Sequence, residues 1–169
     1  VGYNALALDT GGSNTAVGSG ALGANTTAAG NIAMGVNALG AVTTATGNIA
    51  IGNNAGDAIT TGGTSNVFIG TNSGGSLTLG DENIAIGYLS LYYNQSGVRN
   101  IGIGYGALDG NDNFNNSIGI GHNALTSSTG SSNIAIGSLA GDNITTGASN
   151  IIIGMDIDAP SATASNQMS

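Results

Sequence analysis

A unit of about 17 residues repeats along this chain, and the repeat restricts the possible folds more than any other feature of the sequence. The unit opens with Asn and continues as Ile-Ala-Ile-Gly-x-x-Ala-Leu, and a connector rich in Thr and Gly follows it. Positions are counted from the opening residue, so the marker glycine of each unit is position 5. The marker glycines recur every 16 to 18 residues, at Gly2, Gly18, Gly35, Gly52, Gly70, Gly87, Gly104, Gly121, Gly137 and Gly154.

Each unit predicts one short β-strand. Positions 2 and 4 are aliphatic, as at Ile49 and Ile51, which is the period-two pattern of a strand with β-branched residues. Hairpin turns are scarce, since Asn-Gly is absent and Asp-Gly occurs once. Short strands at a constant period, without hairpins, indicate a parallel coil with one unit per turn, in which each repeat stacks only on its neighbours.

We therefore predict an all-β parallel β-solenoid, or β-roll, with about 17 residues per coil and about ten coils over residues 1–158. Residues 159–169 are expected to form a connector that begins a further repeat and leads toward a C-terminal region beyond the sequence given. The chain also begins inside a unit, which indicates a window from a longer repetitive protein.

Residues at the same position of successive units should stack into columns, and two of these columns have a predictable role. The opening Asn column, for example Asn48 and Asn66, either forms a ladder of amide hydrogen bonds between coils or merely suits a turn. The marker glycines are expected where the chain bends with positive φ or where two backbones approach closely.

Position 3 suggests an oligomer. If positions 2 and 4 point into the coil, position 3 points outward, yet it carries only small or apolar residues. We therefore predict that another chain packs against this column, most naturally in a homotrimer. The predicted trimer contacts are Ala16, Ala33, Ala50, Phe68, Ala85, Gly102, Gly119, Ala135 and Ile152.

The composition excludes several classes of protein. The chain has one arginine, no lysine and a formal net charge of -8, so it cannot present the basic surface that nucleic-acid binding needs. It has no cysteine, which excludes disulfide scaffolds and cysteine zinc sites. No apolar run approaches the ~20 residues that span a bilayer, so we expect no membrane insertion.

The sequence predicts no enzyme, no cofactor and no metal site. His122 is the only histidine, no cysteine is present, and no nucleophile or paired carboxylates are marked by spacing. The acidic residues Asp57, Asp109 and Asp142 share position 10, but they lie two or three coils apart. We expect them to be solvated connector residues.

One segment, residues 81–122, differs in composition from the rest of the repeat. It holds the only arginine, the only histidine and four of the five tyrosines. Residues at position 6 of three successive units should stack as a ladder about 5 Å apart. The segment is either an aromatic strip that binds glycan or a place where the chains of the oligomer pack together. The candidate ligand-binding residues are Tyr88, Tyr92, Tyr93, Arg99, Tyr105, Phe114 and His122.

The repeat resembles known fibrous proteins. The units Asn48–Ala55 and Asn133–Ala140 resemble the left-handed parallel β-roll heads of YadA-like trimeric autotransporter adhesins. The fuller pattern Asn14–Leu22, followed by Asn25-Thr-Thr, is similar to long repeat arrays in phage and marine-virus tail fibres. Residues 151–168 resemble the segment that often precedes an intramolecular chaperone domain in such fibres. The resemblance implies a left-handed coil and an extracellular protein on a virion or bacterial surface.

These observations favour a structural and receptor-binding role, as the trimeric shaft or head of a phage tail fibre that mediates host attachment. Its partners would be further copies of itself and a glycan or protein of the host cell surface. The alternative is the head of a bacterial trimeric adhesin that binds matrix or glycan. A minor alternative is an ice-binding solenoid, but the Thr pairs are missing from the units that begin at 83, 100 and 117.

Overall fold

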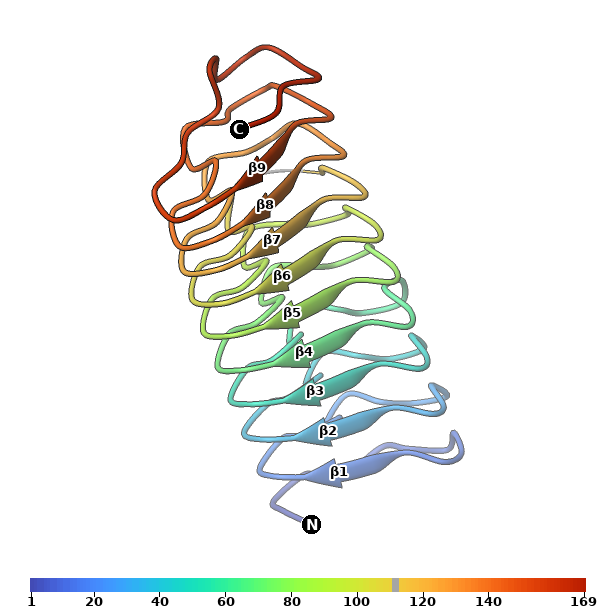
Figure 1. The fold of residues 1–169 in the computed structure, drawn as a ribbon. Helices are drawn as coiled ribbons and strands as arrows, with labels where there is room; N and C mark the ends of the chain where they lie inside the picture. The colour runs from blue at the N-terminus through green and yellow to red at the C-terminus, as the bar shows by residue number, and fades with distance from the viewer. Residues whose placement is uncertain (111–112) are drawn as a thin grey trace.

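One parallel β-sheet winds through the computed structural model, which describes residues 1–110 and 113–169 (Figure 1). Successive strands are neighbours in the sheet, and each has three residues. Paired residues lie 17 positions apart, as in Thr15↔Ile32, with one interval of 18 and one of 16. The strands are β1 Thr15–Val17, β2 Ile32–Met34, β3 Ile49–Ile51, β4 Val67–Ile69, β5 Ile84–Ile86, β6 Ile101–Ile103, β7 Ile118–Ile120, β8 Ile134–Ile136 and β9 Ile151–Ile153.

This arrangement confirms the prediction of an all-β parallel β-solenoid with about 17 residues per turn. The pairing continues past β9, because Met168 forms a parallel bridge with Ile151. The backbone N–H of Gln167 also donates to Oδ1 of Asn150 at 2.8 Å, as an opening residue does in the earlier coils.

The opening Asn column forms a ladder of side-chain hydrogen bonds, the first of the two alternatives that the sequence allowed. Oδ1 of Asn66 accepts from the backbone N–H of Asn83 at 2.8 Å, and Oδ1 of Asn83 accepts from the N–H of Asn100 at 2.9 Å. The amide nitrogen of Asn83 donates to the carbonyl of Gly97, also at 2.8 Å. These side chains are fully buried, so the ladder satisfies groups that could not reach water.

The marker glycines occupy the backbone conformation that was predicted for them. Gly104 has a φ of 130°, a region that L-residues rarely adopt. A Cβ atom there would also collide with the backbone of Gly121 in the next coil. From Gly18 to Gly154 the column therefore allows both the bend after each strand and the close stacking of coils. Its other members are Gly35, Gly52, Gly70, Gly87, Gly121 and Gly137.

The predicted direction of the strand side chains is wrong. Position 3 points into the coil and is buried, whereas positions 2 and 4 point outward. The Asn ladder explains this phase: side chains alternate along a strand, so an inward position 1 forces position 3 inward as well. The predicted trimer contacts are therefore core residues of a single chain, namely Ala16, Ala33, Ala50, Phe68, Ala85, Gly102, Gly119, Ala135 and Ile152.

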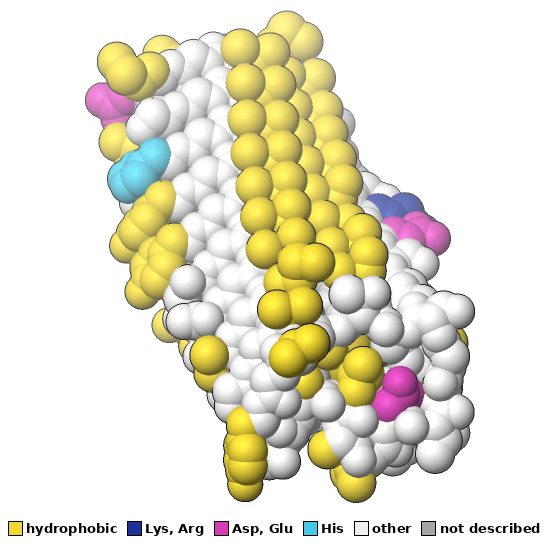
Figure 2. Space-filling model, turned by 90° about the horizontal axis from the view of Figure 1, so that it is seen from below, with side chains coloured by type: hydrophobic (Ala, Val, Ile, Leu, Met, Phe, Trp, Pro, Cys, Tyr) yellow, Lys and Arg dark blue, Asp and Glu magenta, His cyan; other side chains and the backbone are white. Residues whose placement is uncertain are grey.

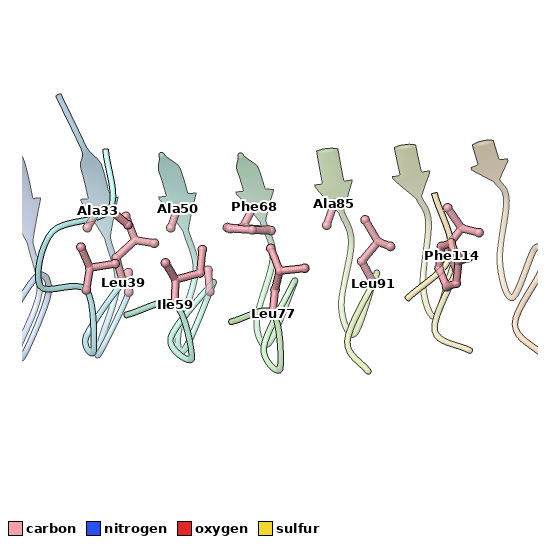
Figure 3. Close-up of a cluster of buried hydrophobic side chains, with 14 of the residues drawn as sticks. Ala33, Leu39, Ala50, Ile59, Phe68, Leu77, Ala85, Leu91 and Phe114 are labelled. Carbon is pink, nitrogen blue, oxygen red and sulfur yellow. The ribbon is translucent and has the colours of Figure 1, made fainter. Parts of the chain in front are cut away.

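The interior of the coil is narrow, and positions 3 and 9 share its volume. Figure 3 shows Ala33, Ala50, Phe68 and Ala85 pointing from the strands toward the interior, where leucines from the opposite side of the coil meet them. At Gly119 a Cβ atom would lie 2.8 Å from Cγ of Leu108, which stands at position 9 of the preceding coil. The small residues at position 3 thus make room for the leucines rather than for another chain.

Candidate interaction surfaces

The outward side chains of positions 2 and 4 form a continuous apolar surface, here called the apolar face. Figure 2 shows it as adjoining yellow columns along the length of the rod. Parallel register places like side chains above one another, as in Ile84↔Ile101 and Ile86↔Ile103. The face consists of Val17, Ile32, Met34, Ile49, Ile51, Val67, Ile69, Ile84, Ile86, Ile101, Ile103, Ile118, Ile120, Ile134, Ile136, Ile151 and Ile153.

The apolar face is unusual for a surface that meets water. Ile153 is 59% exposed and Val17 is 47% exposed. A parallel sheet normally has both of its faces covered, and soluble monomers rarely expose large contiguous apolar patches. Sequence reasoning missed this face because it placed the larger aliphatic residues inside the coil. The Asn column at position 1 was the available sequence signal, because an inward-facing Asn ladder would have placed position 3 inside the coil as well.

Tyr88, Tyr105 and His122 form the predicted aromatic ladder at position 6. The ring centroids of Tyr88 and Tyr105 are 5.5 Å apart with a tilt of 31°, and those of Tyr105 and His122 are 5.1 Å apart in a stacked geometry. All three side chains are exposed. Tyr105 lies between the other two rings, which cover its faces in part, so the ladder presents ring edges and polar atoms together with the outer faces of Tyr88 and His122.

The aromatic ladder borders the apolar face. The isoleucines at position 4 beside the ladder are more covered than those in coils without an aromatic residue. Ile51 and Ile136, in coils without an aromatic residue, are each 39% exposed and count as exposed. Those beside the ladder are half-buried, namely Ile86, Ile103 and Ile120. We attribute this difference to the rings, which cover part of the neighbouring isoleucines across the marker-glycine column. The ladder is therefore one rim of the apolar face.

Arg99 lies at the opposite rim. It precedes β6 by two residues, whereas Tyr105 follows β6 by two residues. Figure 2 shows the cationic side chain on one side of the yellow columns and the histidine on the other. Nε of Arg99 donates to Oδ1 of Asn116 at 2.8 Å. The structure therefore does not bring Arg99 together with the aromatic ladder within one chain.

Phe114 does not belong to a surface site, which corrects the prediction for this residue. Its side chain is 1% exposed and is part of the core cluster. Phe114 is the fifteenth residue of its unit, and Ala28 and Ala45 at that position are buried as well. The small residues in this column were a sequence signal for an inward-facing position.

Tyr92 and Tyr93 form a second, separate aromatic pair. Their ring centroids are 4.8 Å apart in an edge-to-face arrangement, with Tyr93 half exposed. Tyr92 packs over Gly75 of the preceding coil, where a Cβ atom would lie 2.7 Å from its Cε2 atom. This contact gives Tyr92 a packing role at the connector side of the coil.

Three carboxyl groups, those of Asp57, Asp109 and Asp142, have pKa values that burial raises above the ordinary value. Burial raises the pKa of Asp109 to about 6, although the backbone N–H groups of Tyr93 and Tyr92 act in the opposite direction. Burial also raises the pKa of Asp142, and the nearby carboxylates of Asp158 and Asp156 add to this effect. Among the residues that the structure describes, no group of three or more His, Asp or Glu side chains is placed to hold a metal ion.

Comparison of this chain with protein-family models, with curated proteins and with solved structures finds no match. Within residues 1–110 and 113–169 the structure has no helix that is long and apolar enough to cross a membrane. The fold and its surfaces are therefore the basis for a functional proposal.

Proposed function

We propose that this chain is a segment of a homotrimeric extracellular fibre, the shaft or head of a phage tail fibre that mediates attachment to a host. The observation that carries this proposal is the apolar face, which runs over all nine strands of the sheet. Such a surface requires a partner, because exposure of its aliphatic side chains to water is unfavourable.

The partner that fits the apolar face best is another copy of the same rod. Rows of aliphatic side chains repeat along the face at the spacing of the coils, about 4.8 Å. A second rod with the same repeat can match these rows over its whole length. The face contains no charged residue, so like chains can meet there although each has a net charge of -8.

Three copies around an axis parallel to the rods form a closed assembly, in which each chain meets two neighbours. The resemblance of the repeat to trimeric fibres and adhesin heads supports this number. In the assembly the polar connectors remain at the outside, and the rod acts by spacing or presenting a receptor-binding region. It performs no chemistry.

The mass and shape of the purified chain test the proposal. Light scattering should give about three times 16.2 kDa, and electron microscopy should show short rods. Replacing Ile51 and Ile69 by Lys places charges on the apolar face and should yield folded monomers. The matched control Thr44→Lys adds a charge to an exposed connector and should remain trimeric. A folded monomer or dimer of the parent chain at micromolar concentration would contradict the proposed trimer.

Host attachment requires a separate experiment. Labelled trimer is mixed with a panel of bacterial strains, and the cells are sedimented. We expect the trimer to sediment with a limited set of strains. Uniform absence of binding over a broad panel of strains would leave the chain with a spacer role only, and it would contradict receptor binding by this segment.

A further inference from the structure

The two rims of the apolar face carry complementary polar groups at matching heights along the rod. Tyr88, Tyr105 and His122 follow β5, β6 and β7 by two residues each. Glu82, Arg99 and Asn116 precede the same three strands by two residues each, and all three are exposed. The only arginine of the chain thus stands at the height of the middle ring of the aromatic ladder.

These two rims cannot meet within one chain. Strand β6 runs between Arg99 and Tyr105, and each of the two residues lies beyond one of its ends, so their separation is at most roughly 20 Å. The apolar face lies between them, as Figure 2 shows for the cationic side chain and the histidine. A contact between the rims therefore requires a second copy of the chain.

A cyclic trimer supplies that contact. Its interfaces are heterologous, so one rim of each chain's face meets the opposite rim of the next chain. When the chains are in register, the row Glu82, Arg99 and Asn116 lies opposite the row Tyr88, Tyr105 and His122. This follows for either direction of rotation around the axis.

We propose that the aromatic ladder is a binding site for the arginine rim of a neighbouring copy, and that this contact fixes the register of the trimer. The inference rests on the proposed trimer and adds to it the residues that align the chains. The guanidinium of Arg99 in one chain donates hydrogen bonds to the phenol oxygen of Tyr105 in the neighbouring chain. The carboxylate of Glu82 in the first chain accepts a hydrogen bond from the hydroxyl of Tyr88 in the neighbouring chain.

The chemistry of the rims agrees with these pairings. The ring edges and hydroxyl groups point away from the stack, so they can accept from or donate to the neighbouring chain. The bond from Nε of Arg99 to Asn116 uses one of five guanidinium N–H groups and holds the side chain at the rim. The other N–H groups suit the phenol oxygen of the next chain.

The apolar face alone cannot set the register. Its rows are nearly identical from coil to coil, as in Ile49 and Ile51 against Ile134 and Ile136. A slip of one chain by one coil against the other two would therefore preserve most apolar contacts at its two interfaces and lose only the terminal row of each. The polar and aromatic rim residues occur in three coils only, so they distinguish the correct register from a slipped one. In a slipped trimer Arg99 would no longer lie opposite Tyr105 of its neighbour.

Cross-linking between introduced cysteines tests the contact, since the natural chain has no cysteine. The double variant Arg99→Cys with Tyr105→Cys is treated with a short reagent that bridges two thiols. We expect a covalently closed trimer on a denaturing gel. The matched control pairs Arg99→Cys with Asn53→Cys, which stands at position 6 three coils away, and it should give no such product.

The outcomes separate this inference from the proposed function. If light scattering shows a trimer but the 99/105 pair does not cross-link, or the 99/53 pair cross-links equally, the rim contact is wrong and the trimer stands. If the parent chain is a monomer, both are wrong. A closed trimer from the 99/105 pair alone supports both.

A double-mutant cycle tests the hydrogen bond itself. Arg99→Gln and Tyr105→Phe should each raise the trimer dissociation constant by about two- to tenfold per contact. The double variant should show little further loss, because the two groups act as a pair. Tyr93→Phe, an exposed tyrosine outside the ladder, should leave the dissociation constant unchanged. Fully additive losses for Arg99 and Tyr105 would overturn the pairing.

Discussion

Phe68 fills the interior space next to Gly56, where a side chain would not fit. A Cβ atom on Gly56 would lie 2.6 Å from Cδ2 of the phenyl ring. Gly74, at the same position 9 in the next coil, also packs against this ring. Gly141 at position 9 likewise adjoins Ile152 at position 3. Most other coils, by contrast, combine a leucine at position 9 with a small residue at position 3, as with Leu108 and Gly119. In the core of the rod, a large side chain at position 3 or position 9 thus packs against a small residue at the other position.

The compensation between Phe68 and Gly74 can be tested by exchange of volumes. Phe68→Ala should lower the free energy of unfolding by about 3–5 kcal/mol because it opens a cavity. Gly74→Leu should also destabilise, since the new side chain collides with the ring. The double variant should recover part of the loss. Leucine tolerates the backbone there, since Leu108 has a φ of 55° at position 9. Denaturant unfolding measures all three, and losses that simply add would contradict the shared volume.

The Asn ladder predicts a graded response at Asn83. Asn83→Ala leaves the buried N–H of Asn100 and the carbonyl of Gly97 without their partner, at about 1–3 kcal/mol for each group. Asn83→Ser should cost less, because Ser117 already accepts from the N–H of Asn133 at 3.2 Å. Thermal melting followed by circular dichroism ranks the variants. Equal losses for Ala and Ser would show that the acceptor oxygen is unimportant.

The marker-glycine column should be intolerant of any side chain. Gly104→Ala requires an unfavourable φ and places Cβ against the backbone of Gly121, so we expect a loss of on the order of 3 kcal/mol or failure to fold. Gly12→Ala is the matched control, since nothing lies within 4 Å of its Cβ position. It should leave the melting temperature within a few degrees of the parent. Comparable melting of both variants would refute the close-approach argument.

Asp109 should make stability depend on pH. Its folded pKa of about 6 lies above the ordinary value of 3.8, so the folded chain holds the proton more tightly than the unfolded chain. Its contribution to stability should therefore fall as pH rises from about 4 to 6, and above pH 6 it remains unfavourable. Asp109→Asn removes the charge, and should stabilise the chain at pH 7 by about 1 kcal/mol after allowance for solvent screening.

Melting temperatures of the parent and of Asp109→Asn at pH 4, 5, 6 and 7 measure this effect. The two curves should converge at the lowest pH and separate as the pH rises. Asn keeps an oxygen that can accept from the backbone of Tyr92 and Tyr93, so the substitution tests charge rather than loss of that acceptor. A constant difference across the range would assign the effect to packing.

The repeat allowed much of the fold to be predicted. The spacing of the marker glycines, such as Gly87 and Gly104, gave the turn length, and the scarcity of hairpin signals gave the parallel connection. The aromatic ladder followed from Tyr88, Tyr105 and His122 sharing position 6. These inferences depend only on residues of equal register stacking upon one another, which a solenoid enforces along its whole length.

The sequence by itself determined the period, the strand positions and the columns of like residues, because each is a property of spacing along the chain. Only the tertiary structure decided which side of each strand faces inward. A three-residue strand such as Ile49–Ile51 fits either phase, and hydrophobicity alone favours burial of the isoleucines. The narrow interior and the buried bonds of Asn48 select the other phase, so the isoleucines form the outer apolar face and Arg99 and Tyr105 come to stand at its two rims.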